Sequence, residues 1–250
     1  MTAALHPDPA GRYDEAFVAR VLADADDHGA RVYGIAGLQG TGKSTLSAQV
    51  AALAARRGRR VAVLSIDDFY LDQATRRRLG RLVHPLCATR GAPGSHEATL
   101  ACEVIDGLRT GRTIGLPQFD KIADDRLPPA SWPRVSGADL VIFEGWFQKV
   151  PAQDAAELVE PLNALERDED PDGTWRRWSN AALAEDYAQL WTRLDRLLFL
   201  QGPGFEVVPA WRWQQEQTLQ AAHPGRQALR TLPAIAERTI RLDAQRRPLD

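Results

Sequence analysis

Apolar residues recur along this chain in two patterns, one typical of helices and one typical of buried strands. Between residues 13 and 28 they recur every three or four positions, as on one face of a helix. Elsewhere the runs VAVLSI and DLVIF are continuously apolar, as in parallel strands covered on both faces. The patterns predict helices over 13–28, 43–57, 97–109 and 210–222, and strands over 61–66, 139–143, 197–200 and 239–243.

The order of these elements indicates the fold class. The run RVYGIAG enters a glycine-rich turn, the helix over 43–57 follows, and the strand over 61–66 comes next. This order is a βαβ unit, so we expect an α/β fold with a parallel sheet flanked by helices. We expect a loop-rich insertion with a short helix over 70–96, mostly loop over 110–136, and a helical segment over 151–196 that breaks at 171–173.

Charge and cysteine content narrow the function class. The 250 residues carry 31 basic and 33 acidic side chains, a net charge of −2, which argues against a nucleic-acid or acidic-membrane binder. Two cysteines are too few for a disulfide framework. No apolar run approaches the ~18 residues of a membrane span, and the N-terminus lacks the features of a secretory signal. We expect a soluble, cytoplasmic protein, either a monomer or a homodimer.

The most specific motif is GLQGTGKS at residues 37–44, which matches GxxxxGK[ST] between a strand and a helix. Glycines in this turn let backbone N–H groups cradle phosphate oxygens, and the start of the next helix adds its dipole. Lys43 is expected to neutralise the β and γ phosphates, and the Ser44 hydroxyl to ligate Mg²⁺. The nucleotide-binding residues predicted here are Gly37, Gln39, Gly40, Thr41, Gly42, Lys43, Ser44 and Thr45.

Acidic residues end two of the predicted strands. Asp67 and Asp68 follow the strand over 61–66, and Glu144 follows the apolar run DLVIF. Ligands lie at the carboxyl ends of parallel strands, so an acid there can accept the proton of an attacking hydroxyl or help to hold Mg²⁺. The alternative for the aspartates is a helix cap, and acid-ended buried strands also occur without a function. With the phosphate loop nearby, we favour a functional role for these acids.

Two irregular segments add basic residues. RGAPGSHE carries Arg90 and His96 around a tight turn, and LPQFDK carries Asp120 and Lys121, with Arg126 close behind. Each segment alone is typical of a solvated loop. Together they indicate a basic acceptor pocket that faces the phosphate loop.

Two arginines near the C-terminus have two interpretations each. Arg212 lies between two tryptophans, which fits either simple packing or a lid that lays the guanidinium on the transferring phosphoryl group. Arg246 follows the last predicted strand and belongs either to a charged tail or to the edge of an adenine site.

The motifs GLQGTGKST, LSIDDFYL, RGAPGSH, LPQFDK, FEGW and WRWQQE, in this order, resemble those of the plant-type D-glycerate 3-kinase family and its bacterial relatives. The likeness covers residues 32–248 and extends more widely to uridine kinase, pantothenate kinase and phosphoribulokinase. It implies a P-loop NTPase fold, ATP with Mg²⁺ as cofactors, and transfer of the γ-phosphoryl group to a hydroxyl.

Carried over residue by residue, the resemblance makes Asp67 the general base, Glu144 the metal-linked acid and Arg212 the lid arginine. Phe119 stands where uridine kinases carry a tyrosine, which argues against a nucleoside acceptor. The predicted catalytic residues are Lys43, Asp67 and Arg212, the metal ligands are Ser44, Asp67 and Glu144, and Arg246 joins the nucleotide site. The predicted substrate-binding residues are Asp68, Tyr70, Arg90, His96, Asp120, Lys121 and Arg126.

The resemblance also implies an organisation and a reaction. We expect one P-loop kinase domain over 1–250, made of an N-terminal helical extension (1–30), acceptor-side loops (70–136), a helical insertion (151–196) and a lid region (203–232). The expected partner is a small hydroxy acid, D-glycerate, which would become 3-phosphoglycerate, and its carboxylate is best paired by arginine or lysine. Two alternatives stay open: a kinase for another small acceptor, of the uridine or pantothenate type, and a non-catalytic ATP-binding regulatory protein. A GTPase is disfavoured because the chain has no Asn-Lys-x-Asp run.

Overall fold

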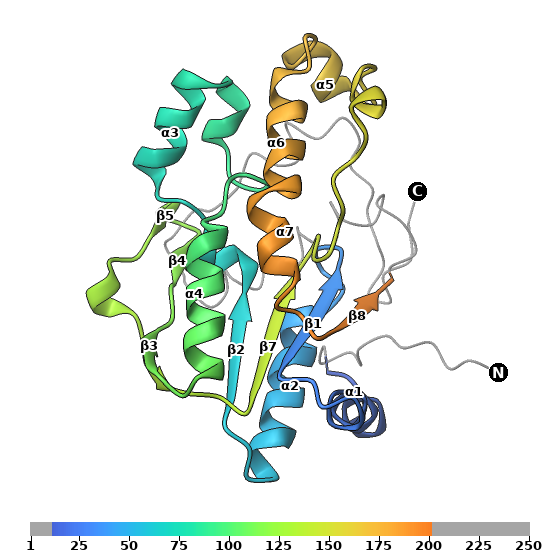
Figure 1. Cartoon of the computed structure of the whole chain (residues 1–250), viewed down its shortest axis with the longest axis vertical. Coiled ribbons are helices and arrows are strands. Elements are labelled where there is room, and N and C mark those ends of the chain that lie inside the picture. The colour runs from blue at the N-terminus through green and yellow to red at the C-terminus, as the bar shows by residue number, and fades with distance from the viewer. Residues whose placement is uncertain (1–11, 202–250) are drawn as a thin grey trace, which may run out of the picture.

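The computed structural model describes residues 12–201, and a parallel sheet forms its centre (Figure 1). β1 (Val32–Gly37), β2 (Val61–Ser65), β7 (Leu140–Gly145) and β8 (Arg196–Leu200) pair in the order β2-β7-β1-β8. Each pairing is parallel. All residues of β1 and β7 are buried, because both strands have neighbours on each side and helices on each face. The predicted α/β fold with a parallel sheet is confirmed.

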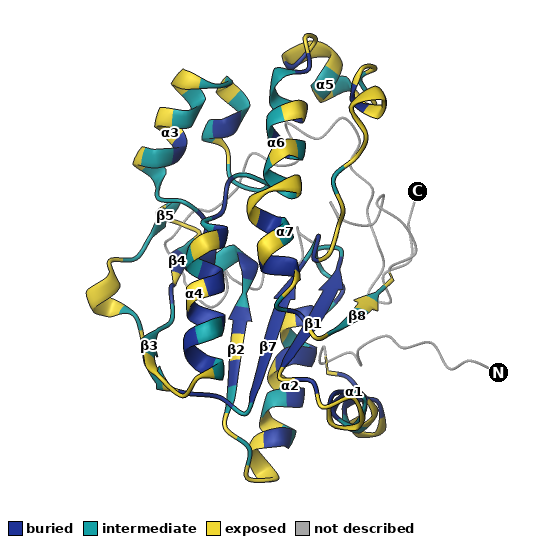
Figure 2. Ribbon diagram, in the orientation of Figure 1, coloured by how far each residue is buried: buried dark blue, intermediate teal, exposed yellow. Residues whose placement is uncertain are grey.

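Helices cover both faces of the sheet. On one face lie α1 (Glu15–Asp27) and α2 (Lys43–Arg56), which pack with the even-numbered apolar residues of β7. On the other face lie α4 (Ala98–Arg109) and α7 (Asp186–Trp191), which pack with the odd-numbered apolar residues of β7. Successive side chains of a strand point to opposite faces, so one continuously apolar strand contributes to two separate cores. Figure 2 shows the buried strands running between these helices.

Two groups of helices lie beyond the carboxyl ends of the central strands (Figure 1). α3 (Gln73–Leu82) stands on one side, and α5 (Ala164–Glu169) and α6 (Thr174–Ala184) stand on the other. The short helix predicted within 70–96 is α3, and the predicted break at 171–173 separates α5 from α6. Both predictions are confirmed. Short 3₁₀ turns lie at Ile66–Phe69, Pro85–Ala88, Pro129–Ser131 and Ala155–Leu158.

Residues 110–136 contain more regular structure than the sequence predicts. They form two small antiparallel ladders, β3 (Thr113–Gly115) with β6 (Arg134–Ser136) and β4 (Phe119–Asp120) with β5 (Asp125–Arg126). Strands of two or three residues are too short to display an alternating pattern, which explains the difference. The second ladder closes the loop that carries Lys121.

Several predicted elements lie outside the described residues: positions 1–11 of the N-terminal extension, the helix over 210–222, the lid region over 203–232 and the strand over 239–243. The single-domain organisation therefore stays a prediction.

Among the helices within residues 12–201, none has both the length and the apolar character needed to cross a membrane.

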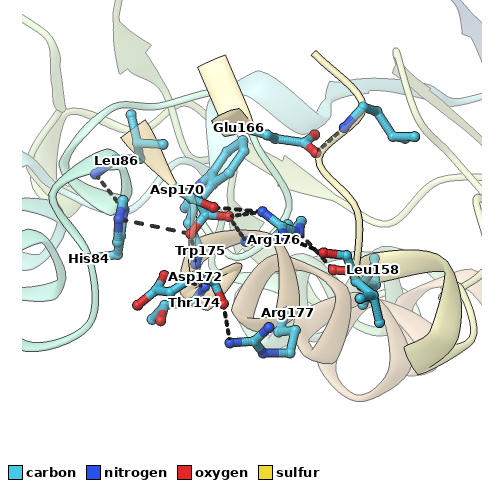
Figure 3. A network of polar contacts seen from close by, with 12 residues as sticks. His84, Leu86, Leu158, Glu166, Asp170, Asp172, Thr174, Trp175, Arg176 and Arg177 are labelled. Atoms are coloured by element: carbon cyan, nitrogen blue, oxygen red, sulfur yellow. Dashed lines mark hydrogen bonds and ion pairs between the residues drawn. The ribbon is translucent and has the colours of Figure 1, made fainter. Parts of the chain in front are cut away.

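A buried ion pair organises the helical insertion (Figure 3). Asp170 and Arg176 are 0% and 7% exposed, and their charged groups lie 3.1 Å apart. The Asp170 carboxylate also accepts the backbone N–H groups of Trp175 and Arg176, while the Arg176 guanidinium donates to the carbonyls of Leu158 and Val159. The pair therefore fixes the start of α6 against the segment that precedes α5.

We expect Arg176→Ala to lower the free energy of unfolding by about 3–5 kcal/mol, because it leaves the buried Asp170 carboxylate without its cation. Arg177→Ala is the matched control. Arg177 is exposed and donates to the carbonyl of Asp172, so its loss should change stability by less than about 0.5 kcal/mol. Urea denaturation measures both variants, and equal midpoints would contradict the role given to the ion pair.

Candidate active site

The predicted phosphate loop joins β1 to α2. Between the end of β1 at Gly37 and the start of α2 at Lys43, Gly40 and Gly42 adopt left-handed φ angles of 85° and 88°. A Cβ atom at Gly42 would lie 2.9 Å from the hydroxyl of Tyr13, so the position excludes a side chain. The first N–H groups of α2 lack partners within the helix. A glycine-rich loop that ends on such groups is suited to binding phosphate.

The Lys43 side chain is buried against the loop that precedes it. Its amine donates to the carbonyl of Leu38 at 3.0 Å, and the Thr41 hydroxyl donates to the same oxygen at 2.8 Å. Burial lowers the pKa of Lys43, and the carboxylates of Glu144 and Asp67 only partly oppose this shift. Because little water screens a buried charge, this amine can interact strongly with a phosphate.

Ser44 and Glu144 come from different elements and meet beside the loop. Ser44 Oγ donates to Glu144 Oε1 at 3.0 Å, and Glu144 is 7% exposed. Sheet pairing places Glu144 opposite Ile35 of β1 and Ser65 of β2. A hydroxyl and a carboxylate next to a phosphate site fit Mg²⁺, which is usually held by one or two carboxylates plus substrate phosphates. Within residues 12–201, no group of three or more His, Cys, Asp or Glu side chains forms a metal site.

Asp67 lies just beyond the carboxyl end of β2, in a turn capped by Ser65. Its carboxylate accepts a hydrogen bond from Lys121 Nζ at 2.6 Å. Burial raises the pKa of Asp67, but the charge and the hydrogen bond of Lys121, together with His96 and a hydrogen bond from Tyr70, lower it by more, so the pKa lies below its ordinary value. Asp67 is therefore ionised at neutral pH and able to accept a proton.

Asp68 lies in a different environment from its neighbour. Burial raises the pKa of Asp68 to about 6, against the opposing effect of a hydrogen bond from the backbone N–H of Phe119. That hydrogen bond, 3.3 Å long, joins the turn after β2 to the loop that carries Lys121. Adjacent acids whose surroundings move their pKa values apart are suited to different roles. The contact of Asp68 with this loop favours a positioning role.

Aromatic side chains lie next to these acids. Tyr70 pairs with His96 through an isolated β-bridge, and their rings stack with centroids 4.1 Å apart. The Tyr187 hydroxyl accepts the N–H of Gly94 at 3.0 Å and lies 2.7 Å from His96 Nδ1. In the neutral tautomer in which Nδ1 accepts the proton of this hydroxyl, the imidazole carries its own proton on Nε2.

His96 offers a buried polar nitrogen at this place. The residue is 6% exposed, and burial lowers its pKa to about 3, although the charge of Asp67 acts in the opposite direction. Among the described residues, Nε2 has no hydrogen-bond partner. Buried polar atoms without a partner are rare in native proteins. Nε2 is therefore available for a hydrogen bond with a small substrate.

The other predicted acceptor-binding residues contact groups in the same loops. Arg90 pairs with Asp124, and Arg126 pairs with Glu97. Asp120 accepts two backbone N–H groups of the turn that follows it. Of the predicted cations, the structure brings Lys121 to Asp67. Substrate contacts of Arg90, Arg126 and Asp120 stay predictions.

One comparison with known proteins concerns the first βαβ unit. The family model described as "Methylmalonyl Co-A mutase-associated GTPase MeaB" matches residues 10–70, which include the phosphate loop and Asp67. The matched stretch holds the strand–loop–helix that P-loop proteins use for phosphates, so it supports nucleotide binding.

Longer matches give the family. The chain is 33% identical over 153 residues to the chloroplastic D-glycerate 3-kinase of Arabidopsis thaliana, a match covering 55% of this chain and 33% of that protein. The solved structure of D-glycerate 3-kinase from Cryptococcus neoformans var. grubii is similar with a TM-score of 0.69 and 26% identity, covering 88% of this chain and 82% of that chain. The uncharacterized kinase mug58 of Schizosaccharomyces pombe is 31% identical over 200 residues, covering 76% of this chain and 71% of that protein. The chain belongs to the D-glycerate 3-kinase family of P-loop kinases.

As a member of the D-glycerate 3-kinase family, the protein is a nucleotide-using phosphotransferase. The structure brings together the predicted phosphate-loop residues, Glu144 and Asp67 at the carboxyl ends of neighbouring strands. Arg212 and Arg246 lie outside the described residues. Their roles at the lid and the adenine site stay predictions, as do the individual catalytic roles of the other site residues.

Two tyrosines at the site of this kinase are absent from the sequence prediction. Tyr187, which orients His96, comes from the helical insertion, and Tyr13, which contacts the phosphate loop, comes from the N-terminal extension. Neither belongs to a motif, and each contacts a residue more than 25 positions away along the chain. No signal in a single sequence identifies such partners.

Proposed function

We propose that this kinase transfers the γ-phosphoryl group of ATP to a hydroxyl of D-glycerate, giving 3-phosphoglycerate. The observation that carries the proposal is the 2.6 Å hydrogen bond between Lys121 and Asp67, which places a cation directly beside the acid that would accept the proton. In glycerate the carboxylate and the hydroxyl-bearing carbons are close together. A small pocket can therefore pair the carboxylate with a cation while a hydroxyl faces the base. Relatives named D-glycerate 3-kinase support the same acceptor.

In the proposed reaction Asp67 accepts the proton of the acceptor hydroxyl, and the hydroxyl oxygen forms a bond to the γ-phosphorus. The bond between that phosphorus and the bridging oxygen breaks, and ADP leaves with its electron pair. Lys43 would neutralise phosphate oxygens during the transfer, and Mg²⁺ held by Ser44 and Glu144 would supply further positive charge. Catalysis would then rest mainly on positioning and electrostatic stabilisation.

The acceptor would occupy the space between the catalytic acids and the aromatic side chains. Lys121 would exchange its bond to Asp67 for one to the acceptor carboxylate, which frees the Asp67 oxygen for a hydroxyl. The Nε2–H group of His96 would donate to another oxygen of the substrate. Because the ring is neutral, it would not compete with Lys121 for the substrate carboxylate. These contacts would select a small hydroxy acid over an uncharged nucleoside.

A coupled ADP-release assay with ATP and Mg²⁺ tests the proposed acceptor. The panel contains D-glycerate, L-glycerate, uridine, pantothenate and a reaction without acceptor. We expect D-glycerate to give the highest kcat/KM and the acceptor-free reaction to remain near background. A higher kcat/KM with uridine or pantothenate would overturn the acceptor assignment but keep the kinase. Silence with every acceptor, while ADP still binds, would favour a regulatory protein.

Replacing Lys121 with glutamine is expected to raise the KM for D-glycerate by about 10- to 100-fold, the size of one charge-assisted hydrogen bond. The KM for ATP should stay within about twofold, because Lys121 contacts the catalytic acid and the phosphate loop is formed by other residues. Lys149→Gln, a change at an exposed lysine, is the matched control and should leave both constants unaltered. An unchanged KM for D-glycerate in the Lys121 variant would rule out its role in carboxylate binding.

A further inference from the structure

Tyr13 is a buried residue outside all the sequence motifs, and it lies against the phosphate loop. It immediately precedes Asp14, the cap of α1, and it is 5% exposed. Its hydroxyl donates to the carbonyl of Thr41. Its ring edge fills the space beside Gly42, where an added Cβ would lie 3.1 Å from ring carbon Cε2. A segment from the N-terminal extension therefore forms part of the outer wall of the loop.

The backbone of Tyr13 is held as firmly as its side chain. Tyr13 N–H donates to Gln49 Oε1 at 2.9 Å, and Gln49 Nε2 donates to the Tyr13 carbonyl at 2.8 Å. Gln49 belongs to α2, the helix that starts at the phosphate loop. The ring of Tyr13 also packs on Phe17 of α1, with centroids 5.4 Å apart. With its backbone anchored to α2, the tyrosine presents its hydroxyl to the loop from a fixed position.

The bond to Thr41 sets the direction of one peptide group. In a planar trans peptide the carbonyl and the following N–H point in opposite directions. Since the Thr41 carbonyl points at Tyr13, the N–H of Gly42 points away from it. This N–H directly precedes Lys43 and the first turn of α2, which makes it one of the groups that a phosphate would meet.

Glycine makes this peptide easy to turn over. Gly42 has a φ of 88°, and glycine populates positive and negative φ about equally. Without an external constraint, rotation about the bonds on either side of the Thr41–Gly42 peptide would turn the carbonyl towards a bound phosphate. A carbonyl oxygen there would repel the anion. If the peptide is already held in its binding conformation before the ligand arrives, no binding free energy is lost in reorienting it.

We propose that Tyr13 is a positioning residue for nucleotide binding: its hydroxyl holds the Thr41–Gly42 peptide with the Gly42 N–H directed at the phosphates. This role concerns the phosphates alone and does not depend on which acceptor the kinase uses. It also gives the N-terminal extension a function at the active site.

Tyr13→Phe tests the proposal, because it removes the hydroxyl and keeps the ring that packs on Gly42 and Phe17. Tyr33→Phe is the matched control. Tyr33 is 2% exposed, and its hydroxyl donates to Asp24 of α1 at 2.7 Å rather than to the phosphate loop. Calorimetric titration with ADP and Mg²⁺, and with inorganic tripolyphosphate, measures binding, and thermal unfolding of the unliganded variants measures stability.

We expect Tyr13→Phe to weaken the binding of ADP and of tripolyphosphate by the same factor, about three- to tenfold, as for the loss of one hydrogen bond. Tyr33→Phe should lower the unfolding temperature but leave both affinities within about twofold of wild type. Unchanged affinities in Tyr13→Phe would overturn the proposal. An equal loss of affinity in Tyr33→Phe would also overturn it, since the effect would then reflect general destabilisation.

Discussion

Replacing Asp67 with asparagine is expected to lower kcat by about 10²- to 10⁴-fold, the usual contribution of a general base. Asparagine keeps the shape of the side chain but cannot accept the proton of the acceptor hydroxyl. The phosphate loop is formed by other residues, so the affinity for ADP should stay within a few-fold of wild type. Steady-state kinetics with ATP and D-glycerate, together with ADP titration, measure the two effects separately.

Asp68→Asn is the informative comparison for this variant. Asp68 accepts the N–H of Phe119. An amide oxygen can still accept this hydrogen bond, but it binds the N–H more weakly than a carboxylate does. We expect a smaller loss of kcat than in Asp67→Asn, accompanied by a higher KM for the acceptor because the loop of Lys121 is less firmly held. If the Asp68 variant loses the larger part of kcat and the Asp67 variant turns over normally, the general base is Asp68.

Lys43→Ala is expected to lower kcat/KM for ATP by about 10²- to 10³-fold, the cost of removing one preorganised electrostatic group. The buried amine lies near Glu144 and Asp67, and its loss would remove the positive charge that offsets the repulsion between these acids and the phosphates. The affinity for ADP should fall in the same variant. Lys149→Ala, at an exposed lysine, should change neither quantity. Unaltered ATP kinetics in Lys43→Ala would contradict the assignment of the phosphate loop.

The central sheet and the phosphate loop could be predicted from the sequence because local signals define both. A strand such as β7 is continuously apolar since both its faces are covered, and the loop needs glycines where φ is positive. Parallel pairing then brings Glu144 to the loop, because the carboxyl ends of neighbouring strands share one edge of the sheet.

The acceptor side could not be predicted in the same detail, since its contacts join residues distant in sequence. The sequence predicts a basic acceptor pocket, but it does not show that Arg90 pairs with Asp124 and that Arg126 pairs with Glu97. Long arginine side chains can pair with carboxylates in neighbouring loops. The spacing of residues along the chain does not show which carboxylate each arginine contacts. The hydrogen bond from Lys121 to Asp67 also joins residues that are distant in sequence, so the sequence predicts Lys121 in the site but not this contact.

The most direct test of the proposed reaction is the proton-coupled phosphorus NMR spectrum of a mixture of the kinase, ATP, Mg²⁺ and D-glycerate. We predict a new phosphate monoester that grows as ATP is consumed, split into a triplet by the methylene protons of 3-phosphoglycerate. A doublet would mean that the hydroxyl on the neighbouring carbon is phosphorylated. Release of inorganic phosphate alone, or no consumption of ATP by protein that binds ADP, would contradict transfer to D-glycerate.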